Sequence, residues 1–342
     1  MRIILDAMGG DNAPGAVVKG AVKACRDFDV DITLVGREED VRACLKGCGA
    51  ENESRITVVN ATEVVTMEDD PAVACRRKKD SSMTLALNMV KNGEGDAAVS
   101  AGSTGALLTG ATLIVKRVRG IRRAAMGPVL PNGGKGVMLI DCGANVECTP
   151  EYLLQFAFMG SFYAERIMGC EKPRVALLNV GTEDTKGGEL QKEAFKLLKA
   201  AGEAGRINFI GNAEGNDLMS GKVDVLVADG FAGNVMLKTV EGAAKFMFKQ
   251  LKGVMYGSLK NKLAALVIKK DLYGMKAMLD PSEVGGTAML GISKPVIKAH
   301  GSSDDRAIYN AVRQAIACVK ANVAGAIEEN IEYMKLTEEK EN

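Results

Sequence analysis

The sequence has few aromatic rings and few histidines, and these shortages exclude several functions. Its 342 residues contain no tryptophan, six tyrosines and a single histidine, His300. A chain with net charge +1 and few rings for base stacking lacks the features of a nucleic-acid-binding protein. One histidine and no C-x-x-C pair cannot supply the usual ligands of a catalytic zinc ion. We therefore expect no nucleic-acid partner and no metal site.

The sequence also lacks long apolar segments and paired cysteines. No run approaches the roughly 18 apolar residues of a membrane-spanning helix, and the N-terminus opens directly into a predicted strand. The eight cysteines are scattered without zinc-ligand spacing, so we expect them to be reduced and mostly structural. These features predict a cytoplasmic protein that is neither secreted nor membrane-spanning.

Apolar segments typical of strands alternate with helical patterns along almost the whole chain. Strands are expected at 2–5, 31–35, 55–59, 96–100, 136–141, 173–179, 207–210, 223–228 and 295–299. Helices are expected at 14–26, 38–48, 81–92, 105–116, 150–168, 187–201, 234–252, 258–270 and 303–330. The alternation predicts a doubly wound α/β/α fold of Rossmann type with a large, mostly parallel sheet.

The domain organisation follows from the same pattern. No low-complexity linker divides the chain, so residues 1–335 are expected to form one catalytic unit, with one lobe or two. Residues 258–280 are expected to form a helical excursion of apolar and basic residues. Residues 336–342 are expected to be a charged tail.

Six of the predicted strands are followed at once by loops of small and polar residues. These loops are DAMGGD (6–11), SAGSTG (100–105), DCGAN (141–145), NVGTEDTKGG (179–188), ADGFAGN (228–234) and AHGSS (299–303). In a parallel sheet such loops share one edge, where ligands bind and helix N-termini present free N–H groups. This edge is therefore a natural phosphate site.

The loops match none of the common catalytic motifs. GSTGALLTG (102–110) is neither a dinucleotide-binding nor a P-loop sequence. A Ser-His-Asp hydrolase would need His300, but the chain has no G-x-S-x-G elbow. A Mg²⁺ ion held by Asp6, Asp11 or Asp229 is an alternative that their carboxylates leave open.

The remaining chemistry is that of a site with few charged groups. One lysine at a loop tip, Lys186, and His300 are the candidates for charged chemistry in these loops. Such a site suits a reaction whose nucleophile is already anionic, because the protein then needs mainly to position it and to stabilise developing charge. Inorganic phosphate that attacks an acyl thioester meets this description, and Lys186 with loop amides could hold it.

The motifs resemble those of a known family. ILDAMGGDNAP, SAGSTGA, NVGTEDTKG, DGFAGNV and HGSS, in this order over about 300 residues, are similar to the bacterial acyl-acyl-carrier-protein:phosphate acyltransferases. Each motif alone is weak, but five in order are specific. The resemblance implies that a long-chain acyl group moves from acyl carrier protein to phosphate, which gives an acyl phosphate for phospholipid synthesis.

The resemblance also implies a structure, partners and a location. The expected fold is akin to isopropylmalate dehydrogenase and phosphate acetyltransferase, in a homodimer that needs no cofactor. The substrates are an acyl carrier protein thioester and inorganic phosphate. The product is handed to a membrane glycerol-3-phosphate acyltransferase, so the cytoplasmic enzyme is expected to associate transiently with the membrane surface.

The catalytic lysine and asparagine of the family fall on Lys186 and Asn234. The ammonium of Lys186 can hold phosphate or the thioester oxyanion, and the amide of Asn234 can donate to a second oxygen. A solvated loop lysine is the alternative for Lys186. Helix N-capping is the alternative for Asn234, which can also fulfil both roles.

The other candidate residues have two interpretations each. His300 is a candidate general acid toward the departing thiolate, or a structural histidine. Asp6 and Asp11 can orient Lys186; alternatively, Asp11 belongs to the turn and cap of helix 14–26. Ser103 and Thr104 can donate hydrogen bonds to phosphate, or they cap a helix. Cys142 is expected to be structural. The substrate- and phosphate-binding candidates are Asp6, Gly9, Gly10, Asp11, Ser103, Thr104, Gly181, Thr182, Asp229 and Gly233.

Two surface segments bear on partners. Residues 262–279 place Leu263, Leu266, Val267, Leu272, Met275 and Leu279 along one side of a helix, flanked by Lys262, Lys269, Lys270 and Lys276. This helix can contact a bilayer or an acyl chain, or form a core or dimer interface. The basic segment 116–123 is a candidate docking site for acidic acyl carrier protein, with 76–79 as a competing site.

Three other functions remain open from the residues alone. A phosphate acetyltransferase that uses short acyl-coenzyme A would employ the same loops. A decarboxylating dehydrogenase of related fold would need NAD and a divalent metal, which no motif supports. A regulatory module that binds phosphate or acyl groups would bind without turnover.

Overall fold

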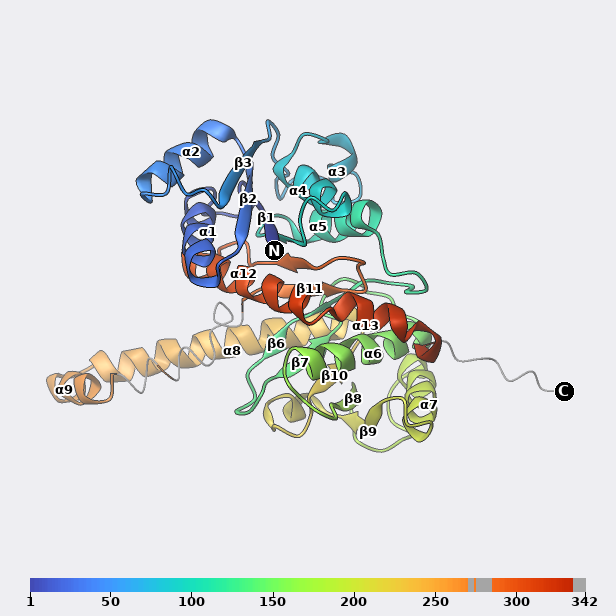
Figure 1. Cartoon of the computed structure of the whole chain (residues 1–342). Coiled ribbons are helices and arrows are strands. Elements are labelled where there is room, and N and C mark those ends of the chain that lie inside the picture. The colour runs from blue at the N-terminus through green and yellow to red at the C-terminus, as the bar shows by residue number, and fades with distance from the viewer. Residues whose placement is uncertain (270–273, 275–284, 335–342) are drawn as a thin grey trace.

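The strands of the computed structural model form two sheets, one above the other in Figure 1. The structure describes residues 1–269, 274 and 285–334. The first sheet has the strand order β3 (Ile56–Asn60), β2 (Asp31–Gly36), β1 (Arg2–Asp6), β4 (Ala97–Ser100), β12 (Val296–Lys298), β11 (Thr287–Leu290), β5 (Ala125–Gly127). The second has the order β6 (Val129–Leu130), β7 (Val137–Ile140), β10 (Val225–Val227), β8 (Arg174–Leu178), β9 (Asn208–Ala213).

Most neighbouring strands in both sheets are parallel. In the first sheet β1 pairs in parallel with β2 and β4, and β12 with β4. In the second sheet β10 pairs in parallel with β7 and β8. The predicted mostly parallel α/β fold is confirmed, with its strands divided between two sheets. The sequence pattern does not reveal β5, β6 and β11, because these antiparallel strands have only two to four residues each.

Helices cover both faces of each sheet, because side chains alternate along the strands. Ile3 and Leu5 of β1 belong to one buried cluster, and Ile4 belongs to another on the opposite face. The helices that pack around the first sheet are α1 (Gly15–Phe28), α2 (Glu38–Gly47), α3 (Ala74–Arg77), α4 (Ser82–Lys91), α5 (Thr104–Gly110), η1 (Ala111–Val115) and α12 (Asp305–Lys320). Near the second sheet are α6 (Pro150–Arg166), α7 (Glu189–Glu203), η2 (Gly215–Met219), α8 (Gly230–Tyr256), α13 (Val323–Glu329) and η3 (Ile331–Met334).

Two differences from the predicted helices bear on the site and the C-terminal part of the fold. The single helix expected at 303–330 is divided into α12 and α13, because Asn322 between them adopts the left-handed conformation with φ 47°. α8 begins at Gly230, four residues before its predicted start.

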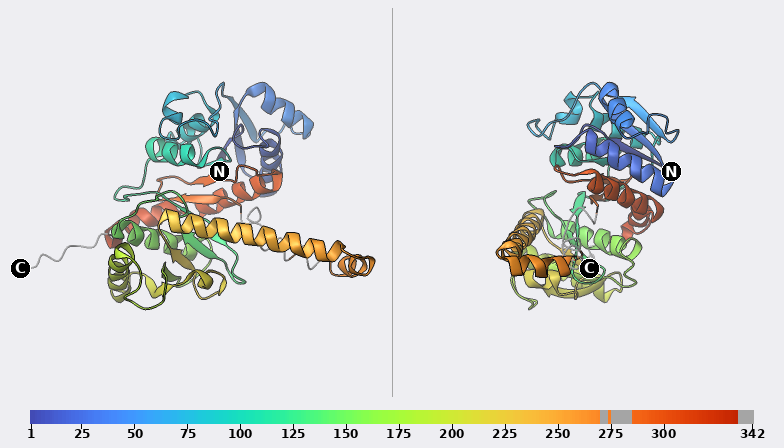
Figure 2. Two further views of the ribbon diagram at one scale, coloured as in Figure 1. Left: turned by 180° about the vertical axis from the view of Figure 1, so that it is seen from behind. Right: turned by 90° about the vertical axis from the view of Figure 1, so that its left-hand side faces the viewer.

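α8 forms a long arm. It begins beside the second sheet and extends away from the body, with α9 (Leu259–Val267) at its far end (Figure 2). At 1.5 Å per residue, this helix of 27 residues is about 40 Å long. The helical excursion predicted at 258–280 is described only to residue 269 and at 274, and the predicted tail at 336–342 lies outside the described residues. None of the described helices could cross a bilayer.

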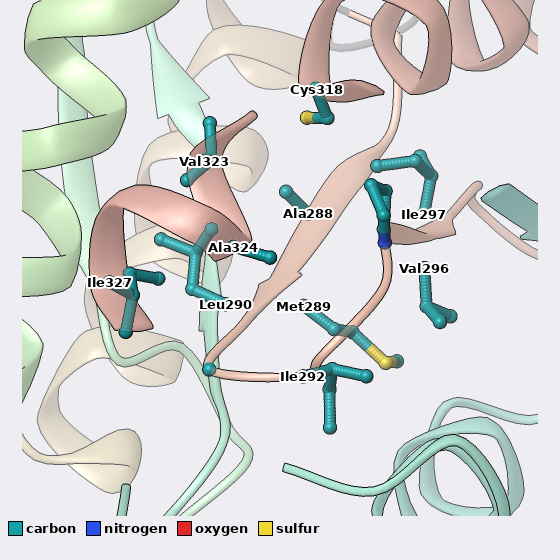
Figure 3. A pocket seen from close by; sticks show the side chains of 12 residues that line it. Ala288, Met289, Leu290, Ile292, Val296, Ile297, Cys318, Val323, Ala324 and Ile327 are labelled. Atoms are coloured by element: carbon teal, nitrogen blue, oxygen red, sulfur yellow. The ribbon is translucent and has the colours of Figure 1, made fainter. Parts of the chain in front are cut away.

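A small apolar cavity lies between the sheet and the C-terminal helices. It has a volume of about 20 Å³ and is lined by β11, β12 and the junction of α12 with α13, including Met289, Val296 and Val323 (Figure 3). The lining includes the start of β12 but not its carboxyl end, so the cavity is separate from the loops that follow the parallel strands.

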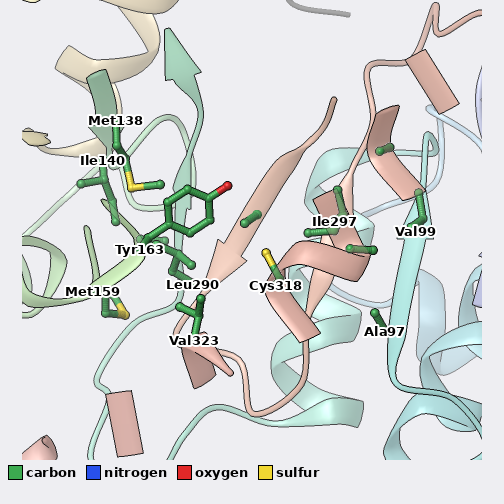
Figure 4. Close-up of a cluster of buried hydrophobic side chains, with 14 of the residues drawn as sticks. Ala97, Val99, Met138, Ile140, Met159, Tyr163, Leu290, Ile297, Cys318 and Val323 are labelled. Atoms are coloured by element: carbon green, nitrogen blue, oxygen red, sulfur yellow. The ribbon is translucent and has the colours of Figure 1, made fainter. Parts of the chain in front are cut away.

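The two sheets share one hydrophobic core. Val99 and Ile297 of the first sheet belong to the same buried cluster as Met138 and Ile140 of the second (Figure 4). Within this cluster Gln314 of α12 donates a hydrogen bond of 2.8 Å to the hydroxyl of Tyr163 on α6. The sheets are therefore held against each other by packed side chains.

Candidate functional site

Lys186 and Asn234 lie at the same edge of the second sheet. Lys186 is in the loop that follows β8, and Asn234 is in the second turn of α8, which follows β10. β10 pairs in parallel with β8. Because loops that follow neighbouring parallel strands emerge at one edge, the topology brings both residues to the same side of the sheet.

Side-chain amides hold the loop that carries Lys186. Asn179 donates to the carbonyl oxygen of Lys186 (3.1 Å) and accepts from the N–H of Val180 (2.8 Å). Asn212 donates to the carbonyl oxygen of Glu183 (2.9 Å). The Lys186 side chain is 49% exposed, and its Nζ lies 3.9 Å from the Glu183 carboxylate. The backbone is therefore fixed while the ammonium stays accessible to a ligand.

Asp229, rather than Asn234, caps α8. Oδ1 of Asp229 accepts a hydrogen bond of 2.8 Å from the N–H of Ala232, so the N-capping interpretation of Asn234 is wrong. Asn234 instead packs against the loop that follows β7, where a β-carbon at Gly143 would lie 3.5 Å from its Cγ. Its side chain is thus released from the capping role.

Asp141, which is not among the predicted site residues, organises the loop beside Asn234. Its buried carboxylate accepts hydrogen bonds from the N–H groups of Met126 (2.8 Å) and Asn145 (2.6 Å). Burial raises the pKa of Asp141, and these hydrogen bonds act in the opposite direction. A β-carbon at Gly233 would lie 2.0 Å from the Asp141 carbonyl oxygen, so α8 packs here only because residue 233 is glycine. The position of Asp141 at the end of a predicted strand is the one sequence feature that marks it.

Cys142 is enclosed. Its side chain is buried, and Sγ donates to the carbonyl oxygen of Leu139 (3.6 Å). Burial, and then the charge of Asp141, raises the pKa of the Cys142 thiol far above its ordinary value. A thiol that stays protonated is a poor nucleophile, so these features support a structural role for Cys142. All eight cysteines are free thiols.

Asp6 lies under the loops of the first sheet, at the end of β1. It is buried, and it accepts hydrogen bonds from Ser100 Oγ (2.6 Å) and from the N–H of Met8 (3.2 Å). Burial raises the pKa of Asp6, and the hydrogen bond from Ser100 lowers it. The structure thus pairs Asp6 with Ser100, whereas the carboxylate that lies within 4 Å of Lys186 Nζ is that of Glu183.

Hydrogen bonds join the loops that follow β1 and β12. The N–H of Asp11 donates to the carbonyl oxygen of Gly301 (2.8 Å). The side-chain amide of Asn12 donates to the carbonyl oxygens of Ser302 and Ser303, both at 3.2 Å. Residues 8–12 and 299–303 therefore form one surface.

The N-caps of α5 and α1 show whether Ser103 and Asp11 are capping residues. Ser103 accepts from the N–H of Ala106 (3.5 Å) and is the N-cap of α5, whose first residue is Thr104. Capping by Ser103 is confirmed, and a phosphate contact remains a proposal. Asp11 does not cap α1, because the N-cap of that helix is Pro14.

Ser302 holds the ring of His300. Nδ1 of His300 lies 2.9 Å from Ser302 Oγ and accepts the Ser302 N–H at 3.3 Å, which places the proton of the neutral ring on Nε2. Partial burial lowers the pKa of His300, and the charge of Lys238 acts in the same direction. The imidazole is therefore neutral at pH 7 and can donate a hydrogen bond from Nε2.

α8 lies close to the loops of both sheets. Lys238 and Glu241 follow Asn234 on this helix and form an ion pair of 2.8 Å. Their charges act on the pKa values of both His300 and Cys142. These charge effects, together with the packing of Asn234 against the loop after β7, indicate that α8 runs beside loops of both sheets. The candidate site lies where these loops meet α8.

The described carboxylates are not grouped as metal ligands. In residues 1–269, 274 and 285–334, no three Cys, His, Asp or Glu side chains are placed to hold one ion. Asp6 is engaged with Ser100 and Asp229 with the start of α8. The Mg²⁺ alternative therefore gains no support from this geometry.

Two groups of exposed side chains form surfaces outside the candidate site. The first, here the basic cluster, consists of the exposed side chains of Lys116, Arg117, Arg119, Arg122 and Arg123. The second, here the apolar arm, consists of Phe246, Met247, Val254, Tyr256, Leu259, Leu263, Leu266 and Val267 on α8 and α9. Leu272, Met275 and Leu279 of the predicted apolar side lie outside the described residues.

The chain is similar to known proteins over almost its whole length. A family model described as fatty acid synthesis protein matches residues 1–326. The chain is similar to the phosphate acyltransferase of Oceanobacillus iheyensis, with 49% identity over 340 residues that cover 99% of this chain and 100% of the relative. It is 52% identical to the phosphate acyltransferase of Bacillus licheniformis over 334 residues, which cover 97% of this chain and 98% of the relative.

Solved structures with the same fold are more distant in sequence. A phosphotransacetylase from Streptococcus pyogenes superimposes with a TM-score of 0.65 at 20% identity, covering 94% of each chain. A branched-chain phosphotransacylase from Enterococcus faecalis V583 gives a TM-score of 0.56 at 15% identity, covering 93% of this chain and 100% of the other. At these identities the likeness establishes the fold alone, which is the one predicted.

Proposed function

The chain belongs to the fatty acid synthesis protein family that includes the phosphate acyltransferases, and from this premise we propose how it acts. It is a transferase that moves a long-chain acyl group from acyl carrier protein to inorganic phosphate. The observation that carries the assignment of its site is that Lys186, in the loop after β8, and Asn234, near the start of the helix after β10, follow neighbouring parallel strands.

In the proposed reaction, phosphate is the nucleophile. It is a dianion near neutral pH, so its oxygen attacks the thioester carbon without a base that removes a proton. The accessible ammonium of Lys186 holds the phosphate and neutralises part of its charge. The Asn234 amide donates to the carbonyl oxygen as it becomes an oxyanion. The C–S bond then breaks, and the thiolate of the carrier takes up a proton.

His300 contributes a hydrogen bond to this last step. Because its pKa is lowered, the ring has little imidazolium at pH 7, and a role as general acid is disfavoured. Its Nε2–H can still stabilise the departing thiolate. The phosphate is further held by donors of the glycine-rich loops, namely those around Gly9, Gly10, Asp11, Ser103, Thr104, Gly181, Thr182 and Gly233, with Asp6 and Asp229 as supports.

The test is formation of acyl phosphate by the purified protein. We expect palmitoyl acyl carrier protein and radiolabelled phosphate to give a lipid-extractable, hydroxylamine-sensitive product. Lys186→Ala should lower its rate at least 100-fold, because a preorganised charge stabilises the transition state strongly. Lys192→Ala, an exposed lysine on the neighbouring α7, is the matched control.

Three outcomes separate the rival functions. Label transferred only from acetyl-coenzyme A would favour the short-chain enzyme. Phosphate binding without any product would favour a regulatory module. Full activity of Lys186→Ala would remove this lysine from the mechanism while leaving the family function intact.

The surfaces suggest how the enzyme meets its partners. The apolar arm supports association with a membrane surface or with a second copy in a homodimer, because large exposed apolar areas mark such interfaces. Membrane contact would bring the acyl phosphate to a glycerol-3-phosphate acyltransferase there. The basic cluster supports docking of the acidic carrier protein. We propose that one two-lobed catalytic unit in the cytoplasm carries all these surfaces.

A further inference from the structure

A buried lysine lies beneath the loops of the first sheet. Lys298 is the last residue of β12 and is only 7% exposed. Its register partner on β4 is Ser100, whose hydroxyl donates to Asp6 at the end of β1. The carboxyl ends of three adjacent strands thus place Lys298, Ser100 and Asp6 in one row. Lysine is almost never fully buried without a specific partner or task.

Lys298 ties two of the site loops together. Its Nζ donates to the carbonyl oxygen of Ala101, the first residue after β4, at 3.3 Å, and to that of Ala299, the first residue after β12. These two loops continue to Ser103 and His300. One ammonium therefore joins the starts of both loops.

The loop after β1 closes over the same point. A β-carbon at Gly9 would lie 2.5 Å from Oδ2 of Asp6 and 2.7 Å from the N–H nitrogen of Gly102, so only glycine allows this approach. A β-carbon at Gly10 would lie 3.0 Å from Ala101 Cβ and from the Gly301 carbonyl oxygen. The backbones of all three loops meet above Lys298.

One of these loops holds a buried hydroxyl without a partner. Among the described residues, Ser303 Oγ is buried and makes no hydrogen bond. A buried polar group of this kind costs free energy unless a ligand or water completes it. Ser303 follows His300 in the loop that Lys298 holds. A ligand bound at this loop could therefore accept the hydrogen bond that the Ser303 hydroxyl lacks.

We infer that Lys298 is a positioning residue for phosphate, and that the loop it holds binds phosphate through the hydroxyl of Ser303. This inference deepens the proposed function and rests on it. Loss of the ammonium frees the carbonyl oxygens of Ala101 and Ala299, and the loops lose their common anchor. Loss of the Ser303 hydroxyl removes one donor and leaves the loops in place.

The buried charge of Lys298 lowers the stability of the folded protein at neutral pH. A residue present only for structure would not need this charge. Burial lowers its pKa from 10.5 to about 8, and the charges of Asp6 and Asp11 oppose this shift. Between these two pH values the folded state binds fewer protons than the unfolded state, so stability rises with pH. An uncharged side chain of similar shape removes this cost at pH 7, while the loss of the hydrogen bonds to Ala101 and Ala299 acts in the opposite direction.

The deciding experiment compares Lys298→Met with Lys294→Met, an exposed lysine before β12. For Lys298→Met we expect a Tm close to that of the wild type, because the removed charge and the lost hydrogen bonds have opposing effects, and at least a tenfold lower kcat/KM for phosphate at pH 7. The wild type should lose kcat/KM as pH rises through about 8, and this decline should be absent from the variant. Burial raises the pKa of Asp6 and lowers that of His300, so the comparison with Lys298→Met is what assigns the decline to Lys298. Lys294→Met should match the wild type in every respect.

Ser303→Ala provides a second, independent arm. We expect an unchanged Tm, and a several-fold weaker binding of radiolabelled phosphate in equilibrium dialysis. If Lys298→Met folds and keeps kcat/KM within twofold with an unaltered pH profile, the inference is overturned. If Lys298→Met does not fold, normal phosphate binding by Ser303→Ala overturns it. Dialysis needs no acyl donor, so a wild type that makes no acyl phosphate would refute the proposed function separately.

Discussion

At the scale of single residues, the candidate site depends on which polar groups are already engaged. Asp229 caps α8, which releases Asn234 to face the loop after β7. Asp141 and Asp6 each hold the loop that follows their own strand through backbone N–H groups. The groups left for substrate are therefore the accessible ammonium of Lys186, the amide of Asn234 and the donors of the loops.

Cys142 provides a test at this scale. Cys142→Ala should retain acyl phosphate formation within about threefold, because a thiol with a strongly raised pKa does not form an acyl-enzyme. The measurement is the rate of product formation, with alkylation of the wild type by iodoacetamide at pH 7 in parallel. A loss of 100-fold in a folded Cys142→Ala variant would contradict this expectation and point to a covalent intermediate.

The sequence reveals those site residues whose neighbours in the chain are informative. Lys186 is visible because it stands at the tip of a glycine-rich loop. Lys298 is not, because a lysine after two apolar residues has the pattern of a strand that ends in solvent. Its burial is caused by pairing with β11 and with β4, and β4 comes from a distant part of the chain. The alternative that Asn234 caps its helix is wrong because α8 begins four residues before its predicted start, so that Asp229 is the cap and Asn234 lies in the second turn.

At the scale of elements, parallel strands and their helices are predicted well, since each has a regular apolar period of its own. The short antiparallel strands β5 and β6 lie in a segment punctuated by Gly and Pro, where pairing rather than local pattern determines the structure. The break between α12 and α13 depends on one residue, Asn322, in the left-handed conformation. Neither the short strands nor the helix break produces a repeating apolar pattern in the sequence.

The apolar arm is the element whose role can be tested alone. Leu266 is 67% exposed on α9. Leu266→Glu should reduce co-sedimentation with anionic liposomes, because a charge in an apolar contact opposes burial, and activity in solution should be unchanged. Gln250→Glu adds the same charge to an exposed polar position of α8 and serves as control. Equal sedimentation of both variants and the wild type would exclude a membrane role for this residue, and a changed oligomeric state of Leu266→Glu would favour the dimer interface instead.

At the scale of the whole molecule, the charges are balanced in number but not in place. The net charge is +1, yet five cationic side chains gather in the basic cluster. A local patch can steer an acidic partner although the global charge is near zero.

Charge reversal in this patch tests the docking of the carrier. Arg122→Glu with Arg123→Glu should raise KM for the carrier thioester about tenfold at low salt and flatten its salt dependence, because steering is lost. KM for phosphate should stay the same. Arg76→Glu with Arg77→Glu is the matched reversal at the competing site. If only that second pair changes KM, the docking site is at 76–79.

The shared core has a consequence for how substrate enters. Enzymes built from separate domains often admit substrate when one domain rotates about a hinge. Here Met138 and Ile297, from different sheets, belong to one buried cluster, and Tyr163 is hydrogen-bonded to Gln314 across it. Rotation of one sheet against the other would open this cluster to water and cost much of its burial free energy. Admission of a long acyl chain must therefore come from movement of the loops and of α8, above two sheets that keep their relative orientation.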